Sequence, residues 1–211
     1  MSTVITEQQL LAMETRYRAA LINSLGGFKS VVLLGTANAA GQTNLAIFSS
    51  FFHLGANPAL CGIIIRPDVA PRHTLNNILE TKSYTINHIN EGIYRQAHQT
   101  SARYGGDESE FVQTGLTPFY VPGIHAPFVQ QSHIQLACEF VQRADITLNG
   151  TILIIGKIVY IHLPENAIGT DGFIDIEKAG TVTCSGLDSY HTTKRLSRLS
   201  YAKPGVLPRD I

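Results

Sequence analysis

A series of short β-branched and apolar runs, separated by Gly, Asn and Pro, constrains the fold of this chain more than any other feature. Runs of this length and composition are typical of strands joined by tight connections. The strands that they predict cover residues 30–36, 43–52, 60–65, 84–89, 134–141, 145–148 and 151–162. About seven short strands with few helices predict a mainly β fold with peripheral helices, closed or partly closed into a barrel.

Helical patterns precede and interrupt these strands. Thr6 and Gln9 form a capping box that begins an amphipathic helix, which is predicted to continue to Gly26. Pro71 precedes an apolar stripe at helical spacing, and this predicts a short helix from about Arg72 to Lys82. Residues 91–102 also have a helical pattern, and residues 104–127 are predicted to form an ordered surface excursion.

The remaining residues, 170–211, are irregular, with one helical turn predicted near residues 175–178. We therefore expect a single domain over residues 1–211, with an N-terminal helix at 1–27 and a C-terminal extension at 170–211. At 211 residues and 44% hydrophobic content, one domain can bury about two-thirds to three-quarters of the unfolded surface.

The charge and cysteine content exclude several classes of protein. The 16 basic and 16 acidic side chains balance, so the basic surface of a nucleic-acid binder is missing. The N-terminal residues fit neither a signal peptide nor a membrane span. Cys61, Cys138 and Cys184 are odd in number and far apart, which argues against a disulfide framework. We expect a protein of the reducing cytoplasm.

Several well-known site motifs are missing from the sequence. No Rossmann glycine motif follows a strand, and no P-loop motif occurs. No Gly-x-Ser-x-Gly elbow surrounds a serine, and the eight histidines lack metal-ligand spacing. We therefore predict no metal site, and any nucleotide must bind to a different kind of scaffold.

Two hydroxyl residues, Ser49 and Ser50, lie between aromatic residues at a predicted strand end. Their hydroxyls either cap a turn or line a ligand site, and the local sequence leaves both interpretations open. In the second, this bend faces the polar edge of a flavin ring, which needs an apolar slot with a few fixed polar contacts. Phe48 and Phe51 either wall that slot or belong to the core.

An anion site is predicted a little further along the chain. Arg66 closes the third strand, and Arg72 and Thr74 lie at the start of a predicted helix, where free N–H groups favour a phosphate. Taken singly, each arginine is better interpreted as a solvated surface residue. Their closeness to the Ser49–Ser50 bend favours the phosphate site. The basic and aromatic residues between Gly186 and Pro204 are either a solvated tail or a further part of the site.

An ordered series of short motifs resembles the flavin reductase-like family of FMN-binding split barrels. The series spans roughly residues 21–204 and comprises Thr36 to Gly41, Asn44 to Phe51, Asn57-Pro58, Arg66, Thr74 to Ile78, Tyr84 to Asn87, Ser109 to Phe111, Gly115-Leu116, Ala126-Pro127 and Gly156 to Val159.

The resemblance implies a six-stranded antiparallel split barrel, usually a homodimer, with FMN near the subunit interface. It implies that Asn44, Phe48, Ser49 and Ser50 contact the ring, that Arg66, Arg72 and Thr74 hold the phosphate or ribityl side, and that Asn87 contacts the chain nearby. Tyr190 and Arg198 are further candidates for closing the site.

The function implied by the resemblance is an FMN-binding flavin reductase or FMN-dependent oxidoreductase, with NADH or NADPH as the electron donor. Stacking and proximity supply most of such catalysis, so we predict no catalytic acid or base. A partner monooxygenase or another acceptor would take the electrons. The alternative is a non-catalytic FMN-binding or electron-transfer protein without its own nicotinamide site, and a third possibility is a barrel that has lost flavin.

Overall fold

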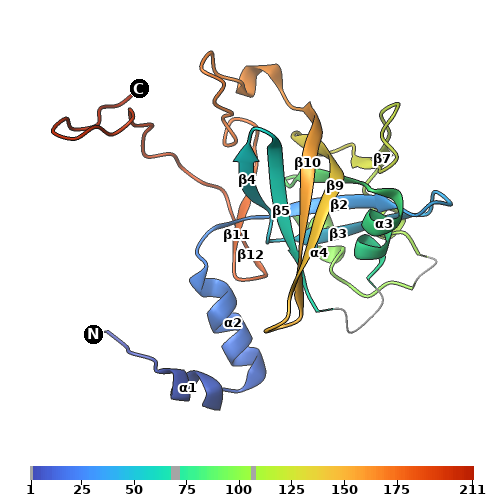
Figure 1. The fold of residues 1–211 in the computed structure, drawn as a ribbon, viewed down its shortest axis with the longest axis horizontal. Helices are drawn as coiled ribbons and strands as arrows, with labels where there is room; N and C mark the ends of the chain where they lie inside the picture. Colours follow the sequence, from blue (N-terminus) through green and yellow to red (C-terminus); the bar gives the residue numbers. More distant parts are fainter. Residues whose placement is uncertain (1, 68–71, 106–107) are drawn as a thin grey trace.

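The main sheet of the protein has seven antiparallel strands in the order β3-β2-β6-β9-β10-β5-β4 (Figure 1). A computed structural model describes residues 2–67, 72–105 and 108–211. The sheet is strongly curved, and its two end strands, β3 and β4, are consecutive along the chain. The predicted mainly β fold is confirmed, although the main sheet has seven strands where six were expected.

The strands of the main sheet other than β4 follow the short apolar runs of the sequence. The strands are β1 (Lys29–Ser30), β2 (Val32–Ala37), β3 (Thr43–Phe48), β4 (Phe52–Ala56), β5 (Ala59–Ile65), β6 (Ser83–His88), β7 (Pro118–Phe119), β8 (Phe128–Val129), β9 (Gln135–Ile146), β10 (Thr151–His162), β11 (Thr183–Ser185) and β12 (Ser189–His191). The prediction of separate strands at 134–141 and 145–148 was wrong, because β9 continues through a bulge in its pairing with β10.

The helices are short and lie at the periphery. They are α1 (Glu7–Ala12), α2 (Thr15–Leu25), α3 (His73–Thr81), α4 (Tyr94–Gln99), α5 (Glu110–Thr114) and a 3₁₀ turn at Glu165–Ala167. The predicted helix from about Arg72 to Lys82 is confirmed as α3, while Pro71, from which its start was inferred, lies outside the described residues. Residues 175–178 form a hydrogen-bonded turn in which the Asp175 carboxylate accepts from the N–H of Lys178.

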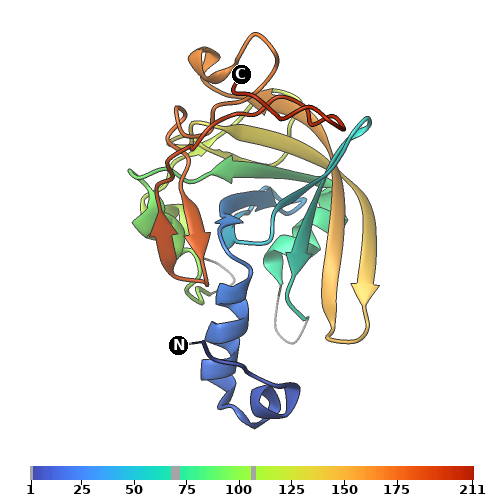
Figure 2. The same ribbon diagram turned by 90° about the vertical axis from the view of Figure 1, so that its left-hand side faces the viewer.

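The N-terminal segment differs from its prediction. The Thr6–Gln9 capping box is present, but the helix ends at Ala12 and a second helix begins at Thr15, capped by the Glu14 carboxylate. This carboxylate accepts from the N–H of Tyr17 at 2.9 Å, so Glu14 begins a new helix instead of continuing the first. Neither helix buries a residue, and together they extend away from the barrel (Figure 2).

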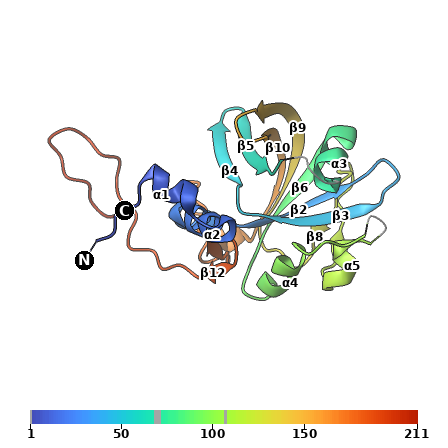
Figure 3. The same ribbon diagram turned by 90° about the horizontal axis from the view of Figure 1, so that it is seen from below.

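Alternation along β2 divides the core into two parts. Val32 and Leu34 pack inside the barrel with residues of α3, whereas Val31 and Leu33 pack with residues of α4 and α5 on the other face. Figure 3 shows α3 on one side of β2 and β3, and α4 and α5 on the other. Because side chains alternate with a period of two, this division decides which residues can share a site.

The segment predicted as a surface excursion contributes to the second part of the core. Phe111 and Leu116 are buried there. Directly after this segment, the N–H of Val129 donates to the Asn87 side-chain oxygen at 2.9 Å. At the other end of the chain, β11 and β12 form a small separate sheet with β1. The last residues extend away from the barrel on the same side as α1 and α2 (Figures 1 and 3).

Candidate flavin site

The bend between β3 and β4 is fastened to β5 by one serine. The Ser50 hydroxyl donates to the carbonyl oxygen of Ile64 at 2.9 Å and accepts from the N–H of Ile64 at 3.2 Å. It therefore replaces a neighbouring strand at this position of β5. Within the described residues the Ser49 side chain makes no hydrogen bond. The hydroxyl of Ser50 thus has a structural role, and the half-buried Ser49 keeps a hydroxyl that is available to a ligand.

This contact places the bend beside the end of β5, where Arg66 follows Ile65. Arg66 is exposed at this strand end. The Arg72 guanidinium donates from Nη2 to the carbonyl oxygen of Pro67 at 2.8 Å, which brings the start of α3 to the same place. Both predicted arginines therefore lie at the end of β5: Arg66 follows the strand directly, and Arg72 is held there by its hydrogen bond to Pro67.

Arg72 carries the most informative atom of the site. Its Nε is buried and has no hydrogen-bond partner, and among the described residues no other buried side-chain nitrogen or oxygen is in this state. Arg72 is also the N-cap residue of α3, and no side chain caps that helix. The first-turn N–H groups and a guanidinium N–H are thus left without acceptors at one place, as an anion site requires.

Thr74, in the first turn of α3, is linked to β3 by a buried polar network. Asn44 Nδ2 donates to Thr74 Oγ1 at 2.9 Å and to Thr36 Oγ1 at 3.3 Å, and Asn77 Nδ2 donates to Thr36 Oγ1 at 3.1 Å. Thr36 and Asn44 are cross-strand partners, so their side chains share a face of the sheet. The resemblance implied that Asn44 contacts the ring, whereas the structure has its amide nitrogen facing Thr74.

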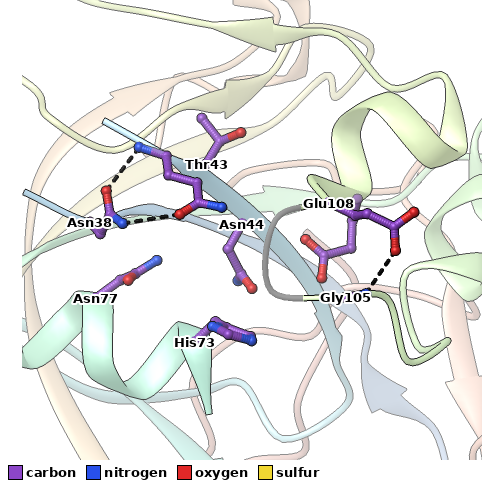
Figure 4. Close-up of a pocket in the computed structure, with 9 residues that line it drawn as sticks. Asn38, Thr43, Asn44, His73, Asn77, Gly105 and Glu108 are labelled. Atoms are coloured by element: carbon purple, nitrogen blue, oxygen red, sulfur yellow. Dashed lines mark hydrogen bonds between the residues drawn. The ribbon is translucent and has the colours of Figure 1, made fainter. Parts of the chain in front are cut away.

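A polar pocket opens beside this network, with a volume of about 320 Å³ that includes space open to solvent. Its lining residues are Asn38, Gln42, Thr43, Asn44, His73, Asn77, Gly105, Glu108 and Glu110. Figure 4 shows His73 and Asn77 on α3, with Asn44 between this helix and Glu108. Both carboxylates have backbone partners, since Glu108 accepts from Gly105 and Glu110 from Leu45.

Three residues of this region were missed by the sequence reasoning: Thr36, His73 and Asn77. Thr36 and Asn77 lie within motifs that carry the family resemblance, but neither side chain was assigned to the site. The usable signal was the period of α3, because Thr74 and Asn77 are three residues apart and lie on one face of a helix. The pairing of Thr36 with Asn44 follows only from the strand register, which the sequence did not reveal.

Phe48 and Phe51 are half-buried and pack against the barrel-side core. Phe48 shares its sheet face with Asn44, because both follow the same alternation along β3. The structure therefore brings seven of the predicted residues to one side of the barrel. These residues, which we call the β3–α3 site, are Asn44, Phe48, Ser49, Ser50, Arg66, Arg72 and Thr74.

Asn87 lies on the opposite face of the sheet. It pairs with Leu33 of β2, which packs in the second part of the core. Its amide nitrogen donates to the Leu33 carbonyl oxygen and to Thr85 Oγ1, and its oxygen accepts from Val129. The side chain is fully buried. The prediction that Asn87 contacts a cofactor is corrected to a structural role, since both of its N–H donors are already engaged.

Tyr190 and Arg198 also lie away from the β3–α3 site within one copy of the chain. Tyr190 packs on the α4 side, where its hydroxyl lies 2.9 Å from Nδ1 of His98. Arg198 pairs with Asp171 and lies over the Phe173 ring, and this guanidinium lowers the pKa of Asp171 below its ordinary value. Neither residue closes the site from its own chain, because other contacts hold both side chains elsewhere.

The barrel interior contains a polar cluster that is separate from this site. The sulfur atoms of Cys61 and Cys138 lie 3.7 Å apart, and the Tyr84 hydroxyl lies 3.9 Å from the Cys61 sulfur. Burial raises the pKa of Tyr84 well above its ordinary value, and contact with Cys61 together with burial raises the pKa of Cys138. Tyr84 and Cys138 are therefore neutral at physiological pH. Across the described ranges, no group of three metal-ligating side chains is present.

Comparison with known proteins defines the class of protein. Residues 25–177 match the model of the flavin reductase like domain. The chain belongs to this family, and its fold is the mainly β split barrel that the resemblance implied.

Several solved structures are similar to this chain. The chain is 52% identical to a candidate flavin reductase with a split barrel domain from Shewanella frigidimarina NCIMB 400, covering 95% of this chain and 100% of that one, with a TM-score of 0.92. Nitrilotriacetate monooxygenase component B from Bacillus cereus is 20% identical, with 94% and 99% covered and a TM-score of 0.81. An FMN-binding protein from Thermus thermophilus is 16% identical, with 78% and 85% covered and a TM-score of 0.63.

Family membership supports a flavin-related oxidoreductase, and the residues present fit a flavin phosphate. The buried Nε of Arg72 lacks an acceptor that a phosphate oxygen would supply, and the uncapped start of α3 lies beside it. Ser49 and Phe48 lie on the same side of the barrel. The fit therefore rests on an unpaired buried donor as well as on the family.

Proposed function

We propose that this protein is a flavin reductase or FMN-dependent oxidoreductase that binds FMN at the β3–α3 site and takes hydride from NADH or NADPH. The single observation that carries the proposal is the buried, unpartnered Nε of Arg72 beside the uncapped N-terminus of α3. Leaving a buried donor of a charged group unpaired costs roughly 1–3 kcal/mol or more. A bound phosphate removes that cost.

Six residues of the site have a part in holding the cofactor. Arg72, Thr74 and the first N–H groups of α3 bind the phosphate, and Arg66 adds positive charge at the rim. Ser49 contacts the polar edge of the ring, while Ser50 holds the bend and Phe48 supports it from the core. FMN supplies the redox chemistry when bound, and the chain supplies position and electrostatics. No acid or base is required from the protein.

The second candidate function is an FMN carrier or electron-transfer protein without a nicotinamide site. It is supported by the composition of the pocket, where amides, hydroxyls and carboxylates predominate. The described lining residues include no phenylalanine, tyrosine or tryptophan that would stack on nicotinamide. Both candidates use the same flavin site. They differ only in whether a nicotinamide can reach the flavin.

We further propose that the functional unit is a homodimer of single-domain subunits. Leu11, Tyr17 and Leu25 of the N-terminal helices expose 70, 63 and 72% of their surface, and the extended C-terminal residues lie on the same side of the barrel. Apolar exposure of this kind is typical of a surface that a partner covers. Sedimentation equilibrium tests this, and a monomer at micromolar concentration would contradict it.

A partner monooxygenase would receive the reduced flavin, as the likeness to a monooxygenase component suggests. Nucleic acid is not expected as a partner, because the charges balance. No helix among the described residues is long and apolar enough to cross a membrane. The three unpaired, buried cysteines suit a reducing compartment such as the cytoplasm.

The test of the proposed function is the visible spectrum of the protein with FMN, recorded before and after anaerobic addition of NADH or NADPH. Loss of the flavin band is the expected result, and the nicotinamide that causes it is the donor. A flavin band that survives both nicotinamides would support the carrier. A protein that binds no flavin would contradict both.

A further inference from the structure

A hydrogen bond from Asn44 to Thr74 leaves the hydroxyl proton of Thr74 free to be donated at the start of α3. Both residues are 8% exposed, and the Asn44 amide nitrogen donates to Thr74 Oγ1 at 2.9 Å. The second N–H of the same amide is directed to Thr36 Oγ1, which also accepts from Asn77. The amide of Asn44 is thus a double donor that is held between two threonines.

A hydroxyl that accepts an N–H keeps its own proton for another acceptor. The proton of Thr74 is therefore available to an acceptor outside the network, and the uncapped N-terminus of α3, where Arg72 is also located, is where a ligand could supply one. Since the groups at the start of α3 are all donors, this place suits a ligand group whose polar atoms are all hydrogen-bond acceptors. Phosphate oxygens are such a group.

We propose that Asn44 is a positioning residue for flavin specificity: it acts through Thr74, and makes the site select a flavin that carries a phosphate over one that lacks it. This inference rests on the proposed function. Asn44 then acts through Thr74 and does not make the contact with the ring that the sequence resemblance had implied. Thr36 and Asn77 hold the Asn44 amide in the orientation in which its nitrogen donates to Thr74.

The test is a double-mutant cycle of Asn44→Ala, Thr74→Val and the double variant. The dissociation constants of FMN and riboflavin are measured by quenching of flavin fluorescence, and the measured quantity is the ratio of the two. We expect each single variant to lose about tenfold of the preference for FMN, as the loss of one hydrogen bond predicts. The double variant should lose no more than either single variant, because both remove the same contact.

A double variant that loses the product of the two single effects would overturn the proposal, since the residues would then act independently. An Asn44→Ala protein with the original preference would also overturn it. If Asn44→Ala does not fold in a thermal unfolding check, Asn44→Ser replaces it, because serine is too short to reach Thr74. Asn87→Ala is the matched control: it removes a buried amide on the opposite face, so the preference should be unchanged.

Failure of the underlying function gives a different result. If the unmodified protein binds neither FMN nor riboflavin, the flavin site itself is refuted. If it binds both flavins and all variants keep the same ratio, the flavin site stands and only the role of Asn44 is refuted.

Discussion

The guanidinium of Arg72 donates from Nη2 to the carbonyl oxygen of Pro67 at 2.8 Å, and this contact joins the start of α3 to the end of β5. It uses one part of the guanidinium and leaves Nε buried without a partner. The geometry of the site therefore depends on the fork of arginine and not on positive charge alone.

Arg72→Lys should weaken FMN binding by roughly 1.5–3 kcal/mol, because lysine keeps the charge but loses the Nε donor and the planar fork. Riboflavin binding should change little, since it has no phosphate. Fluorescence titration of both flavins measures this. Arg95→Ala is a suitable control, because Arg95 is exposed on α4 across the sheet. Equal losses for both flavins would contradict the phosphate role of Arg72.

Ser50→Ala should destabilise the protein by roughly 1–2 kcal/mol, because it removes both hydrogen bonds to Ile64 and leaves the backbone groups of β5 without their partner. Ser49→Ala should leave stability within about 0.5 kcal/mol of the unmodified protein, since a substitution away from internal contacts has little effect. Urea unfolding of the two variants compares neighbouring serines directly. Equal losses of stability would show that the bend is not held by Ser50.

Ser49→Leu should weaken FMN and riboflavin binding by the same factor, because a large side chain crowds the ring edge that both flavins share. This distinguishes a ring contact from a phosphate contact. Titration of the Ser49→Leu variant with the two flavins measures the effect, and unchanged occupancy with an unchanged flavin spectrum would remove Ser49 from the site.

Gly156 allows the ring of Tyr84 to cross the barrel interior. A Cβ at position 156 would lie 1.9 Å from the Tyr84 hydroxyl oxygen, so Gly156→Ala should cost about 1–3 kcal/mol of stability. Gly55→Ala is the matched control in a strand, because the nearest atom to its Cβ would be 3.5 Å away. Thermal unfolding of both variants is the measurement, and equal melting temperatures would contradict the close contact.

His88 should make the stability depend on pH. Burial lowers the pKa of this imidazole to about 4 in the folded state, against an ordinary value of 6.5. Between pH 6.5 and pH 4 the His88 imidazole is protonated in the unfolded chain but not in the folded chain. The contribution of His88 to the free energy of unfolding is therefore fully present above pH 6.5 and is lost as the pH falls toward 4. The loss is roughly 3 kcal/mol at most.

Urea unfolding between pH 7 and pH 4 measures this dependence, and His88→Gln should reduce its slope. The His88 ring lies 3.2 Å from the Thr181 hydroxyl, a contact that glutamine can approximate. An unchanged slope in the variant would show that other groups cause the acid sensitivity.

The fold class could be predicted from the sequence because it depends on local pattern, and the same local pattern pointed to the candidate site. Short β-branched and apolar runs identified the main strands, and the apolar stripe located α3. The break between α1 and α2 was missed because Glu14 caps a helix from within a helical pattern, which periodicity does not detect. The continuity of β9 was missed because its exposed half has no apolar alternation.

Within the candidate site, the residues that the structure brings to one side of the barrel are mostly close in sequence or at adjacent strand ends. Asn87, Tyr190 and Arg198 lie away from these residues. The position of Asn87 depends on which face of the sheet it occupies, and those of Tyr190 and Arg198 depend on contacts between residues far apart in the sequence. A shift of one residue in register reverses the face of every side chain in a strand. The Asn44–Thr74 contact likewise needed the three-dimensional packing of α3 on β3.

Binding of a flavin through its phosphate at the β3–α3 site is tested by titrating the purified protein with FMN and, separately, with riboflavin. We expect a yellow complex with one FMN for each chain and binding of riboflavin that is at least tenfold weaker, a difference of about 1.4 kcal/mol. Equal affinity for the two flavins, or a protein that stays colourless with both, would contradict it.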